Sequence, residues 1–239
     1  MVGERYIDVG NGKVLLMLHG YLSSKESFNA QINFFSRFMR VVAIDMQGFG
    51  KSEEIEYPYS LDDYVLEVKR VLDFIGEDKV DVIAHSFGAR VTIKLANKDK
   101  RIDKIVFTGA AGLKPRRGLK YFFRKASFFI LKKFIKKEKL QFLYSEDYRN
   151  LSPVKKKSFQ KIVSEHLDLE VEKLKNDCLL IFGKRDRQTP PYMAKRMAKK
   201  ICNSKLVFMK ELGHFCFVQN PSKFNSEVFK FLMGQTYGS

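Results

Sequence analysis

The sequence contains no tryptophan and only three cysteines among its 239 residues. Cys178, Cys202 and Cys216 form no C-x-x-C pair, and a small, odd number of separated cysteines argues against a disulfide framework and a zinc site. The first residues, MVGERYIDVGNGK, lack the basic head and apolar stretch of a secretory signal. No apolar run reaches the roughly 18 residues of a membrane-spanning helix. We therefore expect a cytoplasmic protein without a metal ion.

Acidic residues are scarce in one part of the chain. The formal net charge is +17, and the stretch 113–140 holds eleven Lys and Arg against one acid, Glu138. The remaining residues are only moderately basic, so the excess charge needs a local explanation. An apolar content of 45% is ample for a core, and 239 residues fit a single α/β domain.

Strand-like and helix-like segments alternate along most of the sequence. Short apolar stretches predict strands at 5–9, 14–18, 40–44, 80–84, 104–108, 178–182 and 205–209. Apolar residues at helical spacing predict helices within 28–38 and at 61–75, 88–96, 191–200 and 221–232. Asn11-Gly12 predicts a hairpin between the first two strands, and Ser60-Leu61-Asp62-Asp63 predicts a capping box. The alternation predicts an α/β fold whose mostly parallel sheet is covered by helices on both faces.

The alternation stops after Gly112 and resumes near residue 173. The stretch 113–172 is basic, rich in Phe and helical in its spacing, and it contains no clear strand. We therefore predict a core formed by 1–112 and 173–239, with a helical insertion at 113–172 before the last two strands.

Polar and small residues follow the predicted strands, at the edge of the sheet where ligands bind in such folds. They are His19-Gly20-Tyr21, Asp45, Ser86, the loop 109–112, Asp186 and His214. A nucleophile, an acid and a histidine therefore share one edge, in the chain order Ser, Asp, His. That order is the one expected for the α/β-hydrolase arrangement.

Five short motifs extend this pattern. They are VLLMLHGY at 14–21, DMQGFGKS at 45–52, AHSFG at 84–88, GKRDRQTP at 183–190 and GHF at 213–215. With these motifs the chain resembles the α/β-hydrolase superfamily, in the small capped branch that contains carboxylesterases and carbon–carbon bond hydrolases. The resemblance covers nearly the whole chain outside the insertion, and it implies that the insertion is a helical cap over the active site.

These residues have distinct predicted roles. A serine hydroxyl needs an adjacent base, so Ser86 would be the nucleophile, His214 its base and Asp186 the acid that fixes the histidine tautomer. The backbone N–H groups of Tyr21 and Phe87 would form the oxyanion hole. The turn departs from the usual G-x-S-x-G in one position, because its first residue is Ala84.

Each of these residues also has a simpler reading. Ser86 could be an ordinary helix N-cap, and Asp186 could be a turn former. Asp45 competes with Asp186 as the acid but more plausibly stabilises its own loop, whereas Asp177 precedes its strand and lies at the wrong end of the sheet. His19 is expected to pack the oxyanion loop, and His85 is expected to point away from the site.

Arg90 and the G-K-S sequence at 50–52 raise two further questions. Arg90 is either a solvated helix residue or an anchor for a substrate carboxylate, as a similarly placed arginine is in the menaquinone-pathway synthase of this superfamily. G-K-S ends a Walker motif, but Asp45 stands where the motif requires glycine. We therefore expect no nucleotide cofactor, and none of any other kind.

The sequence as a whole predicts a serine hydrolase, and within that class a carboxylesterase that cleaves small to medium acyl or aryl esters through an acyl-enzyme. The alternatives are a carbon–carbon bond hydrolase or menaquinone-pathway synthase-like enzyme with the same triad, and a ligand-binding signalling protein of the same fold. The basic stretch 113–140 predicts peripheral contact with an anionic membrane, secondary to a simple lid role. No nucleic-acid-binding module is visible, and nothing in the sequence fixes an oligomeric state.

Overall fold

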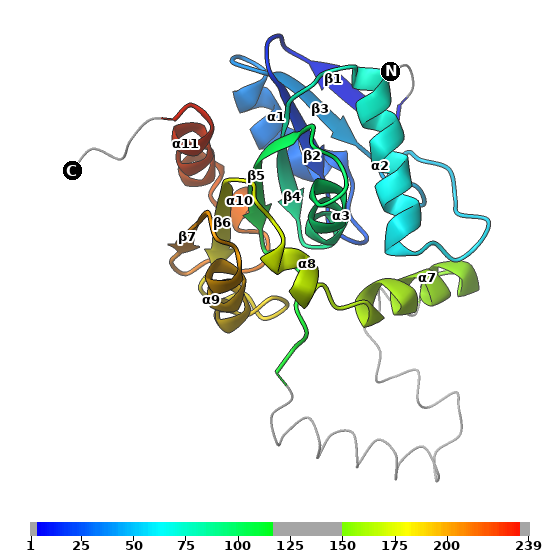
Figure 1. The fold of residues 1–239 in the computed structure, drawn as a ribbon. Helices are drawn as coiled ribbons and strands as arrows, with labels where there is room; N and C mark the ends of the chain where they lie inside the picture. The colour runs from blue at the N-terminus through cyan, green and yellow to red at the C-terminus, as the bar shows by residue number, and fades with distance from the viewer. Residues whose placement is uncertain (1–3, 117–149, 235–239) are drawn as a thin grey trace.

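The computed structural model describes residues 4–116 and 150–234, which form a seven-stranded sheet between two layers of helices (Figure 1). The strand order is β1-β3-β2-β4-β5-β6-β7, and every neighbouring pair is parallel except β1 and β3. The strands are β1 (Tyr6–Val9), β2 (Val14–Leu18), β3 (Arg40–Ile44), β4 (Val80–His85), β5 (Ile102–Thr108), β6 (Cys178–Gly183) and β7 (Ser204–Met209). The predicted strands and the mostly parallel sheet are confirmed.

The predicted hairpin between the first two strands is wrong. β1 pairs with β3, with Tyr6 opposite Ile44 and Val9 opposite Val41. The reason is burial: every residue of β2 is buried, whereas β1 is half-buried to exposed. A strand that is apolar on both faces belongs in the middle of a sheet, so β2 lies between β3 and β4 and β1 occupies the edge.

Helices cover both faces because alternate strand residues point to opposite sides. The helices of the α/β core are η1 (Lys25–Phe28), α1 (Asn29–Phe35), α2 (Leu61–Ile75), α3 (Phe87–Ala96), α9 (Pro191–Lys200), α10 (Cys216–Gln219) and α11 (Pro221–Leu232). On β2, Leu16 and Leu18 belong to the core on the α2, α3 and α9 side, whereas Leu15 and Met17 belong to the core on the α1 and α11 side.

Local sequence signals set the ends of α2. The predicted capping box is confirmed, because the Ser60 side chain accepts a hydrogen bond from the Asp63 N–H while the Asp63 carboxylate accepts one from the Ser60 N–H. At the other end Gly76 adopts the left-handed conformation, with φ of 75°.

The described part of the insertion contains α7 (Pro153–Ser164) and α8 (Asp168–Glu172). The N–H of Leu167 donates to the carbonyl of Gly112, and the Ser158 hydroxyl donates to the carbonyl of Tyr59. These bonds hold α7 and α8 against the core beside α2 and α3 (Figure 1). Most of the basic stretch 113–140 lies outside the described residues. In the described ranges, no helix combines the length and the apolar character needed to cross a membrane.

Candidate active site

Ser86 lies on a sharp turn between β4 and α3. Its backbone has φ of 47° and ψ of −100°, a positive-φ conformation that costs a non-glycine residue free energy and that is typical of a nucleophile elbow. Ser86 is the N-cap residue of α3 by position, but its side chain makes no capping hydrogen bond, so the reading of the hydroxyl as an ordinary helix cap is wrong. The start of α3 packs closely against the end of β2. This packing requires glycine at position 88, because a Cβ there would collide with the Leu18 carbonyl oxygen. Ala84 is fully buried, and its methyl group is accommodated.

His214 and Asp186 form a buried pair on the loops that follow β7 and β6. His214 Nδ1 lies 2.8 Å from Asp186 Oδ2, and both side chains are almost inaccessible to water. The other contacts of the carboxylate come from the N–H groups of Gln188 and Thr189 and from the Thr189 hydroxyl, at 2.7–2.9 Å. Burial acts to raise the pKa of Asp186, but the hydrogen bonds from His214 and Thr189 outweigh it and hold the pKa below its ordinary value.

The loop after β5 makes room for the histidine. Gly109 has φ of +51°, and a Cβ at this position would lie 3.0 Å from His214 Nδ1. Glycine is therefore favoured here for two reasons: the backbone has a positive φ, and a side chain would crowd the histidine ring.

Ser86 and His214 line one cavity of about 170 Å³ at the end of the sheet that α7 covers. Tyr21 and Phe87, the predicted oxyanion donors, line the same cavity, with their rings 5.5 Å apart. Most of the wall is apolar, and α7 contributes Phe159, Ile162 and Val163 to it. The structure thus brings together Ser86, His214, Tyr21 and Phe87 in one cavity, with Asp186 behind the histidine.

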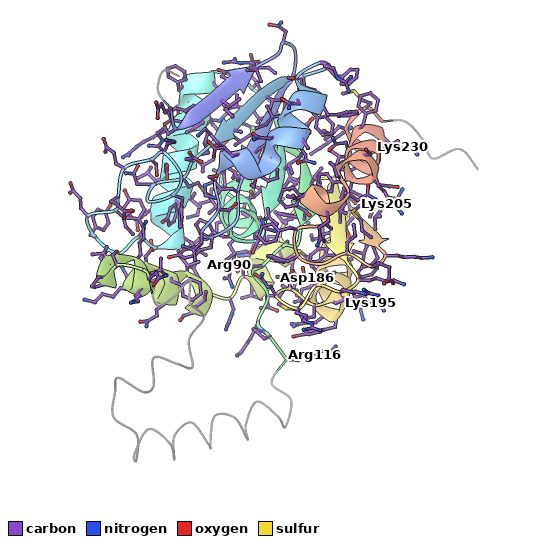
Figure 2. The ribbon with its side chains drawn as sticks, turned by 180° about the vertical axis from the view of Figure 1, so that it is seen from behind. Arg90, Arg116, Asp186, Lys195, Lys205 and Lys230 are labelled. Atoms are coloured by element: carbon purple, nitrogen blue, oxygen red, sulfur yellow. The ribbon has the colours of Figure 1, made fainter. Side chains whose placement is uncertain are left out.

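Arg90 is a buried residue of α3 that lines this cavity, so its reading as a solvated helix residue is wrong. Figure 2 shows it at the same end of the molecule as Asp186. Its Nη1 donates to the carbonyl oxygens of Ile162 at 3.0 Å and Glu165 at 2.7 Å, at the end of α7. Burial lowers the pKa of Arg90 to about 10, which leaves the guanidinium charged at neutral pH.

The residues that competed for the catalytic roles are engaged elsewhere. Asp45 accepts hydrogen bonds from the backbone and ammonium groups of Lys25, both at 2.7 Å, and from the N–H of Lys51. Asp177 is exposed and precedes β6. His19 Nε2 accepts a hydrogen bond from the N–H of Met46, so it connects the loop after β2 to the loop after β3.

Sequence reasoning missed two contributors to the cavity. His85 does not point away from the site but lies against His214, with 4.7 Å between the ring centroids. All residues of β4 are buried, so no alternation of polar and apolar residues could show which way His85 points. The α7 residues were missed because helical spacing identifies an apolar face but not the surface that it covers. Within the described part of the chain, no cluster of His, Cys, Asp and Glu is arranged to hold a metal ion.

Comparisons with known proteins found similar sequences and similar folds. The 2-hydroxymuconate semialdehyde hydrolase of Pseudomonas putida is 26% identical over 94% of this chain and 89% of its own length. The fold is similar to that of a meta-cleavage product hydrolase from Pseudomonas fluorescens, with a TM-score of 0.74 and 23% identity over 97% of this chain and 94% of that one. It is also similar to that of an esterase from Exiguobacterium antarcticum, with a TM-score of 0.76 and 23% identity over 95% of this chain and 94% of that one.

Family models cover most of the sequence. The model for the alpha/beta hydrolase fold matches residues 13–142, over half of the chain, and a model described as a TAP-like protein matches residues 157–236. Sheet order, sequence match and structural likeness therefore agree that the chain belongs to the α/β-hydrolase fold family.

Proposed function

We propose that this protein is a serine hydrolase, and that it cleaves esters with short acyl or aryl groups. The observation that carries the proposal is the arrangement of three side chains. Ser86 lies on a turn with positive φ and makes no capping bond, and it lines one cavity with His214, which is hydrogen-bonded to Asp186. A strained, uncapped serine beside a histidine held by a buried carboxylate is the arrangement that activates a hydroxyl group.

The proposed reaction has two balanced halves. The Ser86 oxygen bonds to the ester carbonyl carbon while its proton passes to His214, and the N–H groups of Tyr21 and Phe87 bind the resulting oxyanion. Collapse breaks the bond to the leaving oxygen, which takes the proton from His214, and leaves an acyl group on Ser86. Water then donates a proton to His214 and bonds to the acyl carbon. The bond between the acyl carbon and the Ser86 oxygen breaks, the Ser86 oxygen takes the proton back from His214, and the acid leaves. Asp186 fixes the tautomer of His214 in both halves.

The size of the cavity predicts a preference for short acyl chains. A volume of about 170 Å³ is small beside the roughly 300–1,000 Å³ of pockets for drug-sized ligands. In a series of p-nitrophenyl esters from acetate to decanoate, we expect kcat/KM to stop rising once the acyl chain fills the cavity, near butyrate. This follows because each further methylene stays in water and gains none of the about 0.8 kcal/mol that burial of a methylene supplies.

Enlarging the cavity tests this reading. Phe159→Ala should shift the optimum to longer chains, whereas Leu169→Ala, an exposed residue of α8, should leave it unchanged. A wild-type optimum at decanoate would contradict the inferred acyl site. Absence of turnover at every chain length would contradict the ester hydrolase itself.

A second candidate function is carbon–carbon bond hydrolysis, which Arg90 favours. A buried, charged guanidinium in the cavity wall suits a substrate with a free carboxylate, and proteins similar to this chain include a 2-hydroxy-6-oxo-2,4-heptadienoate hydrolase. In that reaction the same serine and histidine would act next to a carboxylate held by Arg90.

Arg90→Ala distinguishes the two substrates, provided that its effect on α7 is controlled. Lys94→Ala supplies that control, because Lys94 also joins α3 to Glu165 but does not line the cavity. If Arg90 anchors a carboxylate, its loss should raise KM for 2-hydroxy-6-oxo-2,4-heptadienoate by about 10- to 100-fold, the value of a charged hydrogen bond. KM for a neutral ester should change less than threefold in both variants. Equal effects on both substrates would assign Arg90 to holding α7 alone.

The basic stretch 113–140 has a separate predicted role. Its contact with an anionic membrane remains a prediction, because residues 117–149 lie outside the described part of the chain. Salt-sensitive binding to anionic liposomes that is lost on neutralising these lysines would support it.

A further inference from the structure

His85 precedes the proposed nucleophile and is enclosed by the site. Its side chain is 1% exposed, and its ring centroid lies 4.7 Å from that of His214 and 4.9 Å from those of Phe215 and Phe217. The residue therefore touches the loop that carries the proposed base while its own backbone leads into the turn at Ser86.

The two ring nitrogens of His85 have different surroundings. Nε2 lies 3.3 Å from the backbone carbonyl oxygen of His214, and a carbonyl oxygen can only accept, so Nε2 carries the proton. Nδ1 is then the unprotonated nitrogen, and it is buried without a hydrogen-bond partner. It faces Gly20, where a Cβ would lie 2.6 Å from Nδ1. The ring thus fills the space between the oxyanion loop and the loop of the base.

An apolar side chain at this position would avoid the cost of burying an unpartnered nitrogen. A methionine could make similar contacts with Phe215 and Phe217 and would leave no polar atom unsatisfied. What an imidazole adds is a donor for the His214 carbonyl. Burial and the neighbouring His214 lower the pKa of His85 to about 3, so its ring is uncharged at neutral pH. His85 therefore supplies the donor without placing a positive charge beside the proposed base.

We propose that His85 is a positioning residue that fixes the backbone of His214 relative to Ser86 and the Gly20 loop. The inference rests on the proposed function, because the contact matters for turnover only if His214 is the base and Ser86 the nucleophile. Ser86 and His214 come from loops 128 positions apart in the sequence, and the 3.3 Å contact from His85 joins them directly. Misplacement of a catalytic group by about 1 Å can cost about 100-fold in rate, so a single such bond affects turnover.

Two near-isosteric variants test the proposal. His85→Gln keeps an N–H group that can reach the His214 carbonyl, whereas His85→Met has similar volume and no donor. With p-nitrophenyl butyrate, His85→Met should lower kcat by about 10- to 100-fold with KM within threefold of wild type, and His85→Gln should recover most of the loss. Equal kcat values for the two variants would overturn the proposal, whether both fall or neither does. The melting temperature of each variant reports whether it is folded.

A measurement on the resting wild-type protein makes the test independent of turnover and of variant folding. In NMR spectra of protein labelled with ¹⁵N-histidine, the His85 ring at pH 7 should be the neutral tautomer protonated at Nε2. The signals of His85 are those that are missing from the spectrum of His85→Gln. A ring protonated at Nδ1 would overturn the proposal even if the variants fail to fold. Absence of ester turnover in the wild type would instead contradict the proposed function and leave the tautomer result to decide on the contact.

Discussion

Ser86→Ala is expected to lower kcat for ester hydrolysis by about 10⁶-fold, the effect of removing a nucleophile that acts as one unit with its base. Within the described residues the Ser86 side chain makes no capping hydrogen bond that would give it a structural role, so the variant should keep the melting temperature of the wild type. The measurement is pre-steady-state turnover of p-nitrophenyl butyrate, in which the wild type should release a burst of up to one p-nitrophenol per chain and the variant none.

Ser164→Ala is the matched control for this experiment. Ser164 is an exposed residue at the end of α7, its hydroxyl donates to the Gln160 carbonyl, and it is not among the described residues that line the cavity. Its removal should leave kcat within twofold of wild type. Activity of Ser86→Ala within tenfold of wild type would assign the hydrolysis to another group and reject the acyl-enzyme on Ser86.

Asp186→Asn is expected to lower kcat by about 10⁴-fold while KM changes little. The carboxylate oxygen Oδ2 accepts from His214 Nδ1 at 2.8 Å, and Oδ1 is occupied by the N–H groups of Gln188 and Thr189. Because those two donors keep an oxygen at Oδ1, the asparagine must turn its NH₂ group toward His214. The ring would then carry its proton on Nε2, where it cannot accept one from Ser86.

Asp177→Asn is the control, since it removes the same charge at an exposed position that precedes β6. We expect it to change kcat less than twofold. A loss of only tenfold or less in Asp186→Asn would show that another group fixes the tautomer of His214. Asp45 could not be that group, because Lys25 and Lys51 occupy its oxygens.

Much of the core could be predicted because its signals are local. The predicted bounds of the helices 61–75, 191–200 and 221–232 agree with the structure, since a capping box, a left-handed glycine or an initial proline marks their ends. The helix expected within 28–38 ends at Phe35, where Ser36 and the residues after it turn toward β3. The cap 113–172 stays a prediction, supported by α7 and α8 and otherwise outside the described residues.

The sequence by itself determined which residues could meet at the carboxyl edge of the sheet. In a parallel sheet all strands end at one edge, so the residues after β4, β6 and β7 had to gather there, and Ser86, Asp186 and His214 occupy those positions. The order and residue types needed no knowledge of packing.

Only the tertiary structure decided the contacts that depend on distant segments. β1 pairs with β3 because burial on both faces places β2 inside the sheet, which overrides a turn signal at Asn11-Gly12. Arg90 bonds to carbonyl groups at the end of α7, and His85 contacts His214. In each case the partner lies more than thirty residues away, and a fully buried strand or helix gives no periodic signal of where its polar side chains point.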